Sequence, residues 1–175
     1  VFSSKQSLLN YHPVLPMAET ASVFCEMLVT DNLLKLVKDD MTKIQIITEK
    51  LEDLFATSHR QNMFSCFEKS AHDNVVKNYL SFDDFSHLYK VELQKMFGTV
   101  VKIPQEFEWE WASIPHFIDY PFYVYAYNFG NLLVIALYQI YKEQGVEFIP
   151  KLKQLLSAGA SASPLDLTKA LNIDI

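Results

Sequence analysis

Two glutamates on one predicted helix are the first residues in the chain whose spacing suggests chemistry. Glu19 and Glu26 are seven residues apart and Ser22 lies three residues after Glu19, so a period of 3.6 places all three on one face. Carboxylates beside apolar surface are seldom buried without a cation, a histidine or a metal ion as partner. The spacing therefore indicates either a metal or polar site, or a row of carboxylates in solvent.

A histidine followed by tyrosines forms a second candidate group. His116 lies in a predicted turn just before Pro121, which is placed to start a long apolar helix. Tyr123 and Tyr127 share one helical face, and Tyr125 lies about opposite. The pattern fits a polar cluster at the mouth of a helix, and equally a surface histidine beside core aromatics.

Helices dominate the predicted secondary structure that must position these groups. No Gly or Pro interrupts residues 39–97, and apolar residues recur there at helical spacing. Ser81 is a predicted N-cap, and Gly98 and Gly145 are predicted helix ends. The predicted helices cover about residues 17–37, 41–78, 82–97, 121–144 and 146–157, with a last one starting at Ser163 and Pro164.

Composition bounds the class of protein. With 175 residues, half of them hydrophobic, the chain can bury a sizeable core, and one domain over residues 1–175 is expected. A net charge of −6 and the lack of a basic stripe in the sequence argue against binding of nucleic acid. Cys25 and Cys66 have no C-x-x-C spacing, which is typical of reduced thiols in a cytoplasmic protein. Residues 122–141 approach the length of a membrane span, but their amides and hydroxyls favour a buried helix instead.

Several segments match the motifs of one enzyme family. Residues 18–22, Ala-Glu-Thr-Ala-Ser, followed by Glu-Met-Leu at 26–28, resemble the segment that supplies the third zinc ligand in the oligoendopeptidase F and thimet oligopeptidase family of zinc metallopeptidases. Ile-Pro-His-Phe at 114–117 and Pro-Phe-Tyr-Val-Tyr-Ala-Tyr at 121–127 are similar to its motif carrying a substrate-contacting histidine and tyrosines.

Two further matches are weaker. Gln-Asn-Met-Phe-Ser-Cys-Phe-Glu, at 61–68, resembles the family's Phe-x-x-Phe-Glu signature. Arg60 and Glu68 are candidates for buried or half-buried polar contacts there, or equally for exposed charges on the flank of a helix. Residues 159–174 resemble the C-terminus of oligoendopeptidase F, with Asn172 where Gly is frequent; Asn also tolerates the left-handed backbone that a terminating residue needs.

The resemblance implies a role for each candidate. Glu19 is the zinc ligand, Glu26 a carboxylate that supports it, and His116 contacts the substrate, while Tyr123 or Tyr125 donates to the oxyanion. The implied fold class is all-α, a multi-helix C-terminal portion of the catalytic domain of a zincin-type oligopeptidase. The implied partners are short peptides, with no nucleic acid and no membrane.

The family's H-E-x-x-H helix is absent from these residues. We therefore expect the chain to be a single all-helical C-terminal fragment of a cytoplasmic zinc metalloendopeptidase, with the remainder of the parent chain as its partner. The isolated fragment is expected to be inactive and without zinc, because one carboxylate cannot hold the ion. The alternatives are a non-catalytic helical domain that binds peptides or proteins, and a degenerate peptidase that binds peptides without cutting them.

Overall fold

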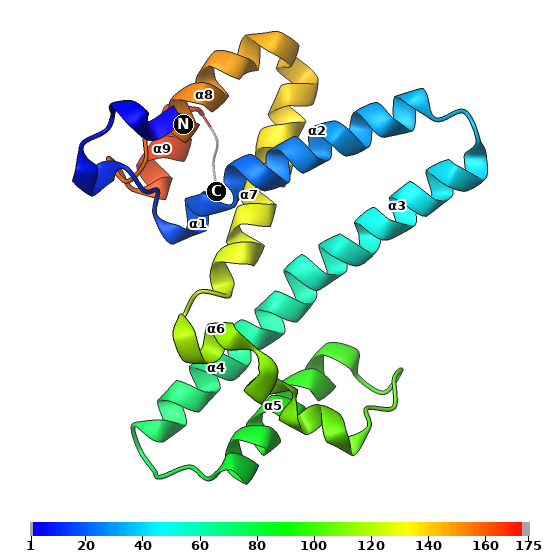
Figure 1. Cartoon of the computed structure of the whole chain (residues 1–175), viewed down its shortest axis with the longest axis vertical. Helices are drawn as coiled ribbons and strands as arrows, with labels where there is room; N and C mark the ends of the chain where they lie inside the picture. The colour runs from blue at the N-terminus through cyan, green and yellow to red at the C-terminus, as the bar shows by residue number, and fades with distance from the viewer. Residues whose placement is uncertain (1, 173–175) are drawn as a thin grey trace. The chain divides into compact units, whose positions relative to one another are not determined.

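The computed structural model describes residues 2–172, which form helices and turns without any strand. The all-α prediction is confirmed. The chain divides into two compact units, one made of Val1–Asp53 and Phe129–Ile175 and the other of Leu54–Asn128 (Figure 1). Each unit is described by itself below, and the single domain expected over residues 1–175 stays a prediction.

The first unit is built around α2 and α7. Its α-helices are α1 (Leu15–Ala18), α2 (Thr20–Leu36), most of α3 (Asp40–Phe55) and α7 (Tyr125–Gln144), α8 (Ile149–Ser157) and α9 (Pro164–Ala170). Short 3-10 helices cover Phe2–Lys5, Leu8–Asn10 and Gly145–Phe148. The buried apolar core consists of Met17, Phe24, Leu133, Val134, Leu137, Tyr138, Phe148, Leu152, Leu155 and Leu171.

The N-terminal segment of this unit lies directly on the loop after α8. The N–H of Ala160 donates to the carbonyl of Asn10 at 3.0 Å, and the side chain of Gln6 donates to the carbonyl of Ser157 at 3.0 Å. Gly159 has φ +55°, and a Cβ atom there would lie 1.9 Å from the Asn10 carbonyl oxygen. Both the backbone angle and the close approach therefore require glycine at 159.

In the second unit two α-helices pack against each other, and a 3-10 helix packs on the second of them. It contains a π-helical turn (Ala56–Arg60), α4 (Gln61–Val75), α5 (Phe82–Phe97), a 3-10 helix (Gln105–Ser113) and α6 (Pro115–Asp119). The fully buried Tyr89 donates its hydroxyl to Glu110, which also pairs with Arg60. Its buried apolar core consists of Met63, Phe64, Phe67, Ala71, Tyr89, Leu93 and Val124.

The long helix predicted over residues 41–78 is present with one irregularity. It is helical from Asp40 to Val75, but Ala56–Arg60 form a π-helical turn between α3 and α4. Within this turn Ser58 donates its hydroxyl to the side-chain oxygen of Asn128 at 3.0 Å. Such turns widen the helix locally, and periodicity alone does not predict them.

The predicted caps are confirmed. Ser81 and Asp84 form a reciprocal capping box at the start of α5, and Gly98 ends that helix with φ +59°. Ser163 accepts from the N–H of Asp166 at the start of α9. Asn172 adopts φ +58°, the left-handed conformation expected of it. The last two residues of the C-terminal resemblance, Ile173 and Asp174, lie outside the described residues.

The prediction that Pro121 starts the long apolar helix is wrong. α7 begins at Tyr125, and residues 120–123 form a turn in which Phe122 has φ +61°. A helix cannot pass through that backbone conformation, so it starts after it. Within residues 2–172 no helix, α7 included, is both long and apolar enough to cross a membrane.

Candidate active site

Glu19 lies at the junction of α1 and α2, where the sequence predicted one continuous helix over 17–37. Its N–H donates to the carbonyl of Met17, two residues back, and the α-helical run is interrupted at this residue. The hydroxyl of Ser22 donates to the Glu19 carbonyl at 2.9 Å and lies 3.2 Å from its carboxylate. The predicted contact across one helix face is therefore made, and it holds the carboxylate of a half-buried residue.

A glycine on α7 allows this junction to approach. Gly130 is buried, and a Cβ atom built on it would lie 3.4 Å from Cβ of Glu19 and 3.5 Å from the carbonyl oxygen of Pro16. A larger side chain at 130 would therefore push against both residues. The α1–α2 junction at Glu19 thus packs against α7.

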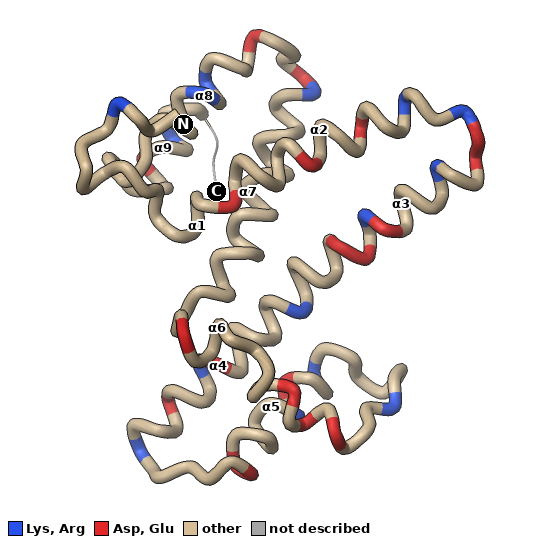
Figure 2. Tube along the Cα trace, viewed as in Figure 1, with Lys and Arg blue, Asp and Glu red and all other residues tan. Residues whose placement is uncertain are grey.

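Glu26, one further step along the same face, is an exposed residue that forms an ion pair with Lys50 of α3. Acidic and basic residues are interspersed along α2 and α3 (Figure 2), so this pair is one of several charge contacts on these helices. An exposed pair of this kind contributes little to stability. A role for Glu26 beside a metal ligand stays a prediction.

The residues between 2 and 172 contain no cluster of three or more His, Cys, Asp or Glu side chains placed to hold a metal ion. A catalytic zinc needs three protein ligands, drawn from nitrogen, sulfur and carboxylate oxygen. Glu19 fits one such position by its chemistry. The other ligands would have to come from residues outside this set.

His116 and two tyrosines form a cluster in the second unit. Pro115 starts the short helix α6, so His116 occupies its first turn. The hydroxyl of Tyr127 lies 3.2 Å from Nε2 of His116. The ring of Tyr123 lies 5.4 Å from that of His116 and 5.3 Å from that of Tyr127, measured between centroids. One imidazole and two phenols are thus packed together in a half-buried position.

Tyr123 and Tyr127 lie apart from Tyr125, as predicted, although Tyr123 precedes the start of α7. Tyr123 and Tyr127 lie together, whereas the side chain of Tyr125 is 45 % exposed. The sequence reading assigned the oxyanion role to Tyr123 or Tyr125 and left Tyr127 among the core aromatics. The signal for Tyr127 was its place one helical turn after Tyr123, on the face shared with it.

The sequence predicted a buried or half-buried polar contact for Glu68 without naming its partner. This residue of α4 is 3 % exposed, and its Oε1 accepts a hydrogen bond from the backbone N–H of Phe122 at 2.5 Å. Burial raises the pKa of Glu68, although the Phe122 N–H and the charges of His72 and His116 act in the opposite direction. Arg60, the other residue considered there, pairs with Glu110 instead.

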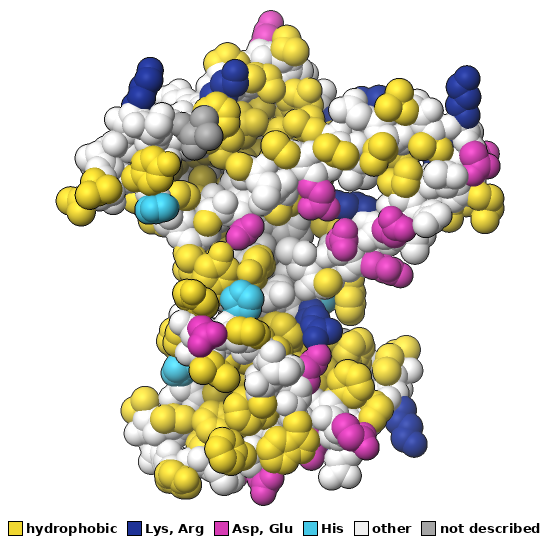
Figure 3. Space-filling view, viewed as in Figure 1, with side chains coloured by type: hydrophobic (Ala, Val, Ile, Leu, Met, Phe, Trp, Pro, Cys, Tyr) yellow, Lys and Arg dark blue, Asp and Glu magenta, His cyan; other side chains and the backbone are white. Residues whose placement is uncertain are grey.

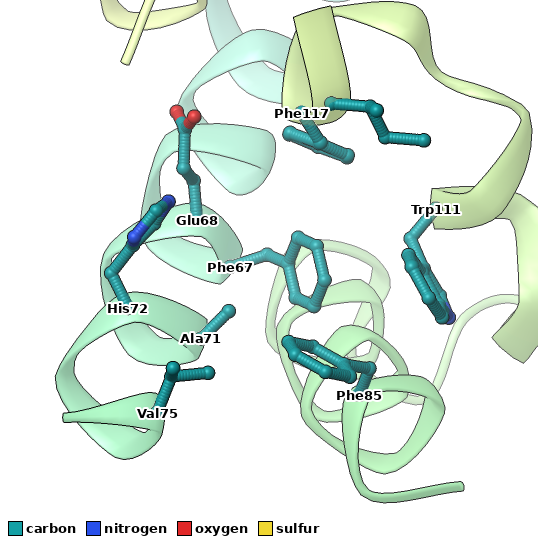
Figure 4. Close-up of a pocket in the computed structure, with 9 residues that line it drawn as sticks. Phe67, Glu68, Ala71, His72, Val75, Phe85, Trp111 and Phe117 are labelled. Carbon is teal, nitrogen blue, oxygen red and sulfur yellow. The ribbon is translucent and has the colours of Figure 1, made fainter. Parts of the chain in front are cut away.

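A pocket of about 240 Å³ lies beside Glu68. Phe67 projects from α4 toward Phe85 and Trp111, and Phe117 lies across from Glu68 (Figure 4). Hydrophobic side chains also cover much of the face of this unit that is visible in the lower part of Figure 3. The carboxylate of Glu68 is thus held at the edge of an apolar environment.

The sequence model of Peptidase family M3 matches residues 2–175 of this chain, including every candidate residue above. The chain belongs to peptidase family M3. This M3 chain is 32% identical over 160 residues to the plasmid oligoendopeptidase F of Lactococcus lactis subsp. cremoris, covering 91% of this chain and 26% of that protein. It is 31% identical to the oligopeptidase PepF of Bacillus subtilis, covering 91% of this chain and 24% of that protein.

A solved structure agrees with this assignment. The crystal structure of oligoendopeptidase-F from Enterococcus faecium superposes with a TM-score of 0.79 at 29% identity, over 92% of this chain and 31% of that one. The M3 chain therefore spans about a quarter of the length of the curated relatives it matches. Glu19 belongs to its first unit and His116 with Tyr123 to its second, so their meeting at one metal cleft stays a prediction.

Proposed function

We propose that this chain is part of a zinc-dependent metalloendopeptidase that hydrolyses short peptides. In this proposal Glu19 supplies the third zinc ligand, and His116 with a tyrosine binds the peptide around the scissile carbonyl. Family membership supports the peptidase activity. The observation that carries the assignment of residues is the contact between Tyr127 and His116, with Tyr123 packed on both.

The donor set fits a catalytic zinc if the parent enzyme contributes two histidines. Two histidines and one glutamate form a known zinc site that leaves one position open for water. Zinc in such a site lowers the pKa of bound water to about 7 and polarises a carbonyl. The part of this chain is to hold one carboxylate in place, which the Ser22 bond and the close approach of Gly130 both do.

Phenol and imidazole groups can stabilise the oxyanion that forms when a peptide carbonyl is attacked. A hydrogen-bond donor at that position is worth about a hundredfold or more in rate. We assign this donor to Tyr123 in preference to Tyr125, because the ring of Tyr123 lies against His116. Tyr127, bonded to Nε2, orients the imidazole so that its other nitrogen can face the substrate.

Replacement of Glu19 by Gln in the full-length protein tests the ligand assignment. We expect zinc content, measured by elemental analysis after gel filtration, to fall far below one ion per chain, and peptide hydrolysis to be lost with it. The matched control is Glu147→Gln, an exposed glutamate in the 3-10 helix after α7, which should keep both. A Glu19→Gln protein that retained zinc and cleaved peptides would reject the assignment.

Two Tyr→Phe variants distinguish the oxyanion candidates. Tyr123→Phe is expected to lower kcat about a hundredfold, while Tyr125→Phe is expected to stay near wild type. If only Tyr125→Phe lost activity, the assignment would pass to that residue. Equal activity in both variants would remove the oxyanion role from this segment.

We also place the enzyme in the cytoplasm and Glu26 in a supporting role near the metal ligand. Both cysteines are free and exposed, which suits a reducing compartment. Cell fractionation tests the location. Glu26→Gln should weaken zinc binding by about tenfold, as replacement of residues that support a metal ligand commonly does. A variant with the zinc affinity of the wild type would remove Glu26 from the site.

A further inference from the structure

The peptide N–H of Phe122 is bonded to a side chain rather than to another part of the backbone. Its acceptor is Oε1 of Glu68, a carboxylate that is 3 % exposed and lies one residue after the core residue Phe67. A hydrogen bond in the low-dielectric interior of a protein is electrostatically stronger than the same bond in water. The rigid helix α4 thus holds one specific point of the turn before α7.

That point is the strained residue of the turn. Phe122 has φ +61°, a left-handed conformation that disfavours residues with a Cβ atom. Its ring packs on His72, with the centroids 4.5 Å apart, and His72 is one helical turn after Glu68 on α4. Two neighbouring positions of α4 therefore hold both the backbone and the side chain of Phe122.

The turn so held leads directly into the tyrosine cluster. The N–H of Tyr123 donates to the carbonyl of Tyr120 at 3.2 Å, and the Tyr123 carbonyl accepts from Ala126 at the start of α7. A change of the Phe122 backbone would therefore rotate the bond that carries Tyr123 toward or away from His116. We propose that Glu68 is a positioning residue that fixes Tyr123 against His116 through its bond to the Phe122 N–H.

This inference rests on the proposed function, and three variants of the full-length enzyme test it. Glu68→Leu fills the buried position with a side chain of similar size that has no hydrogen-bond acceptor. Glu68→Gln retains an acceptor oxygen without a charge. Asp73→Asn, an exposed carboxylate on the same helix, is the control. We expect kcat to fall about tenfold to a hundredfold in Glu68→Leu with KM little changed, because misplacement by about 1 Å can cost a hundredfold. Glu68→Gln should stay within about threefold of wild type, since it restores the acceptor.

Hydrogen–deuterium exchange, read by mass spectrometry, gives a result that does not depend on activity. The peptide containing residues 117–124 should exchange faster in Glu68→Leu than in wild type and Glu68→Gln, while a peptide from α5 stays unchanged. If wild type hydrolysed no peptide, the proposed function would fail, and this exchange result would still decide whether Glu68 holds the turn. Unchanged exchange in Glu68→Leu, or equal kcat in the Leu and Gln variants, would overturn the inference.

Discussion

Gly130 of α7 faces Glu19 so closely that a Cβ atom on the glycine would lie 3.4 Å from Cβ of the glutamate. A helix interior is a costly place for glycine, by about 1 kcal/mol relative to alanine. Here a Cβ atom at 130 would be in van der Waals contact with the α1–α2 junction, so a side chain larger than alanine would crowd it. The position of the candidate zinc ligand is thus set from α7 as well as from its own helix.

Replacement of Gly130 by Val should disturb both folding and metal binding. The branched side chain would crowd Glu19 and Pro16, and overpacking of this kind costs about 1–3 kcal/mol. We expect a lower unfolding temperature and reduced zinc content in the full-length protein. Leu132→Val, at an exposed position of α7, is the control and should change neither. A Gly130→Val protein with normal zinc content would show that the contact does not position Glu19.

Comparison of two glycines with similar positive φ angles distinguishes the free-energy cost of backbone strain from that of a steric clash. Gly159 and Gly145 have φ +55° and +63°, but only at Gly159 would a Cβ atom meet another group, the Asn10 carbonyl. Gly145→Ala should cost about 1 kcal/mol, the backbone term alone, and Gly159→Ala should cost more than about 3 kcal/mol. Denaturant unfolding of both variants measures the difference. Equal losses would mean that the segment at Asn10 moves away freely.

Removal of the Tyr127 hydroxyl should affect turnover through His116. In Tyr127→Phe the imidazole loses its partner at Nε2, so we expect kcat to fall by about tenfold or more and the pH dependence of kcat to change. Tyr141→Phe, a tyrosine of the same helix that packs against the core of the first unit, is the matched control. Steady-state kinetics across a pH series provide the measurement. A profile identical to that of wild type would remove Tyr127 from the site.

The buried carboxylate of Glu68 predicts a pH dependence of folding. Burial raises its folded-state pKa above the ordinary value of 4.5, so the folded protein holds that proton more tightly than the unfolded chain. The protonated Glu68 side chain contributes fully to the free energy of unfolding below pH 4.5, and this contribution is lost as the pH rises through the raised pKa. The unfolding temperature of Glu68→Gln should therefore rise relative to that of wild type as the pH is raised from 4.5 through the raised pKa of Glu68. A difference that does not vary with pH would contradict this.

Local signals in the sequence determine much of this fold. The caps at Ser81 and Ser163 and the left-handed Asn172 involve residues within a few positions of one another, so they could be predicted. The apolar period over residues 41–78 likewise predicted a long helix. These features depend on propensity and spacing, which a sequence displays directly.

Contacts between distant segments could not be predicted in this way. The start of α7 was misplaced because Phe122 bonds to Glu68, which lies 54 residues earlier in the chain. The helix break at Glu19 involves a backbone bond to Met17, two residues back. The close contact at Gly159 involves the carbonyl of Asn10, which is distant in the sequence. In the candidate site, spacing grouped Tyr123 with Tyr127, but only the fold gave Tyr127 its partner His116.

The π-helical turn at Ala56–Arg60 has a consequence for how this helix tolerates changes in length. Such a turn contains about one residue more than an α-helical turn, and each residue of an α-helix turns the chain by about 100°. Deletion of a single residue there would restore a regular helix, whereas an insertion between residues 61 and 67 would rotate Glu68 away from Phe122. Alignments of this helix with longer or shorter chains should therefore place a one-residue gap at residues 56–60 rather than between 61 and 67.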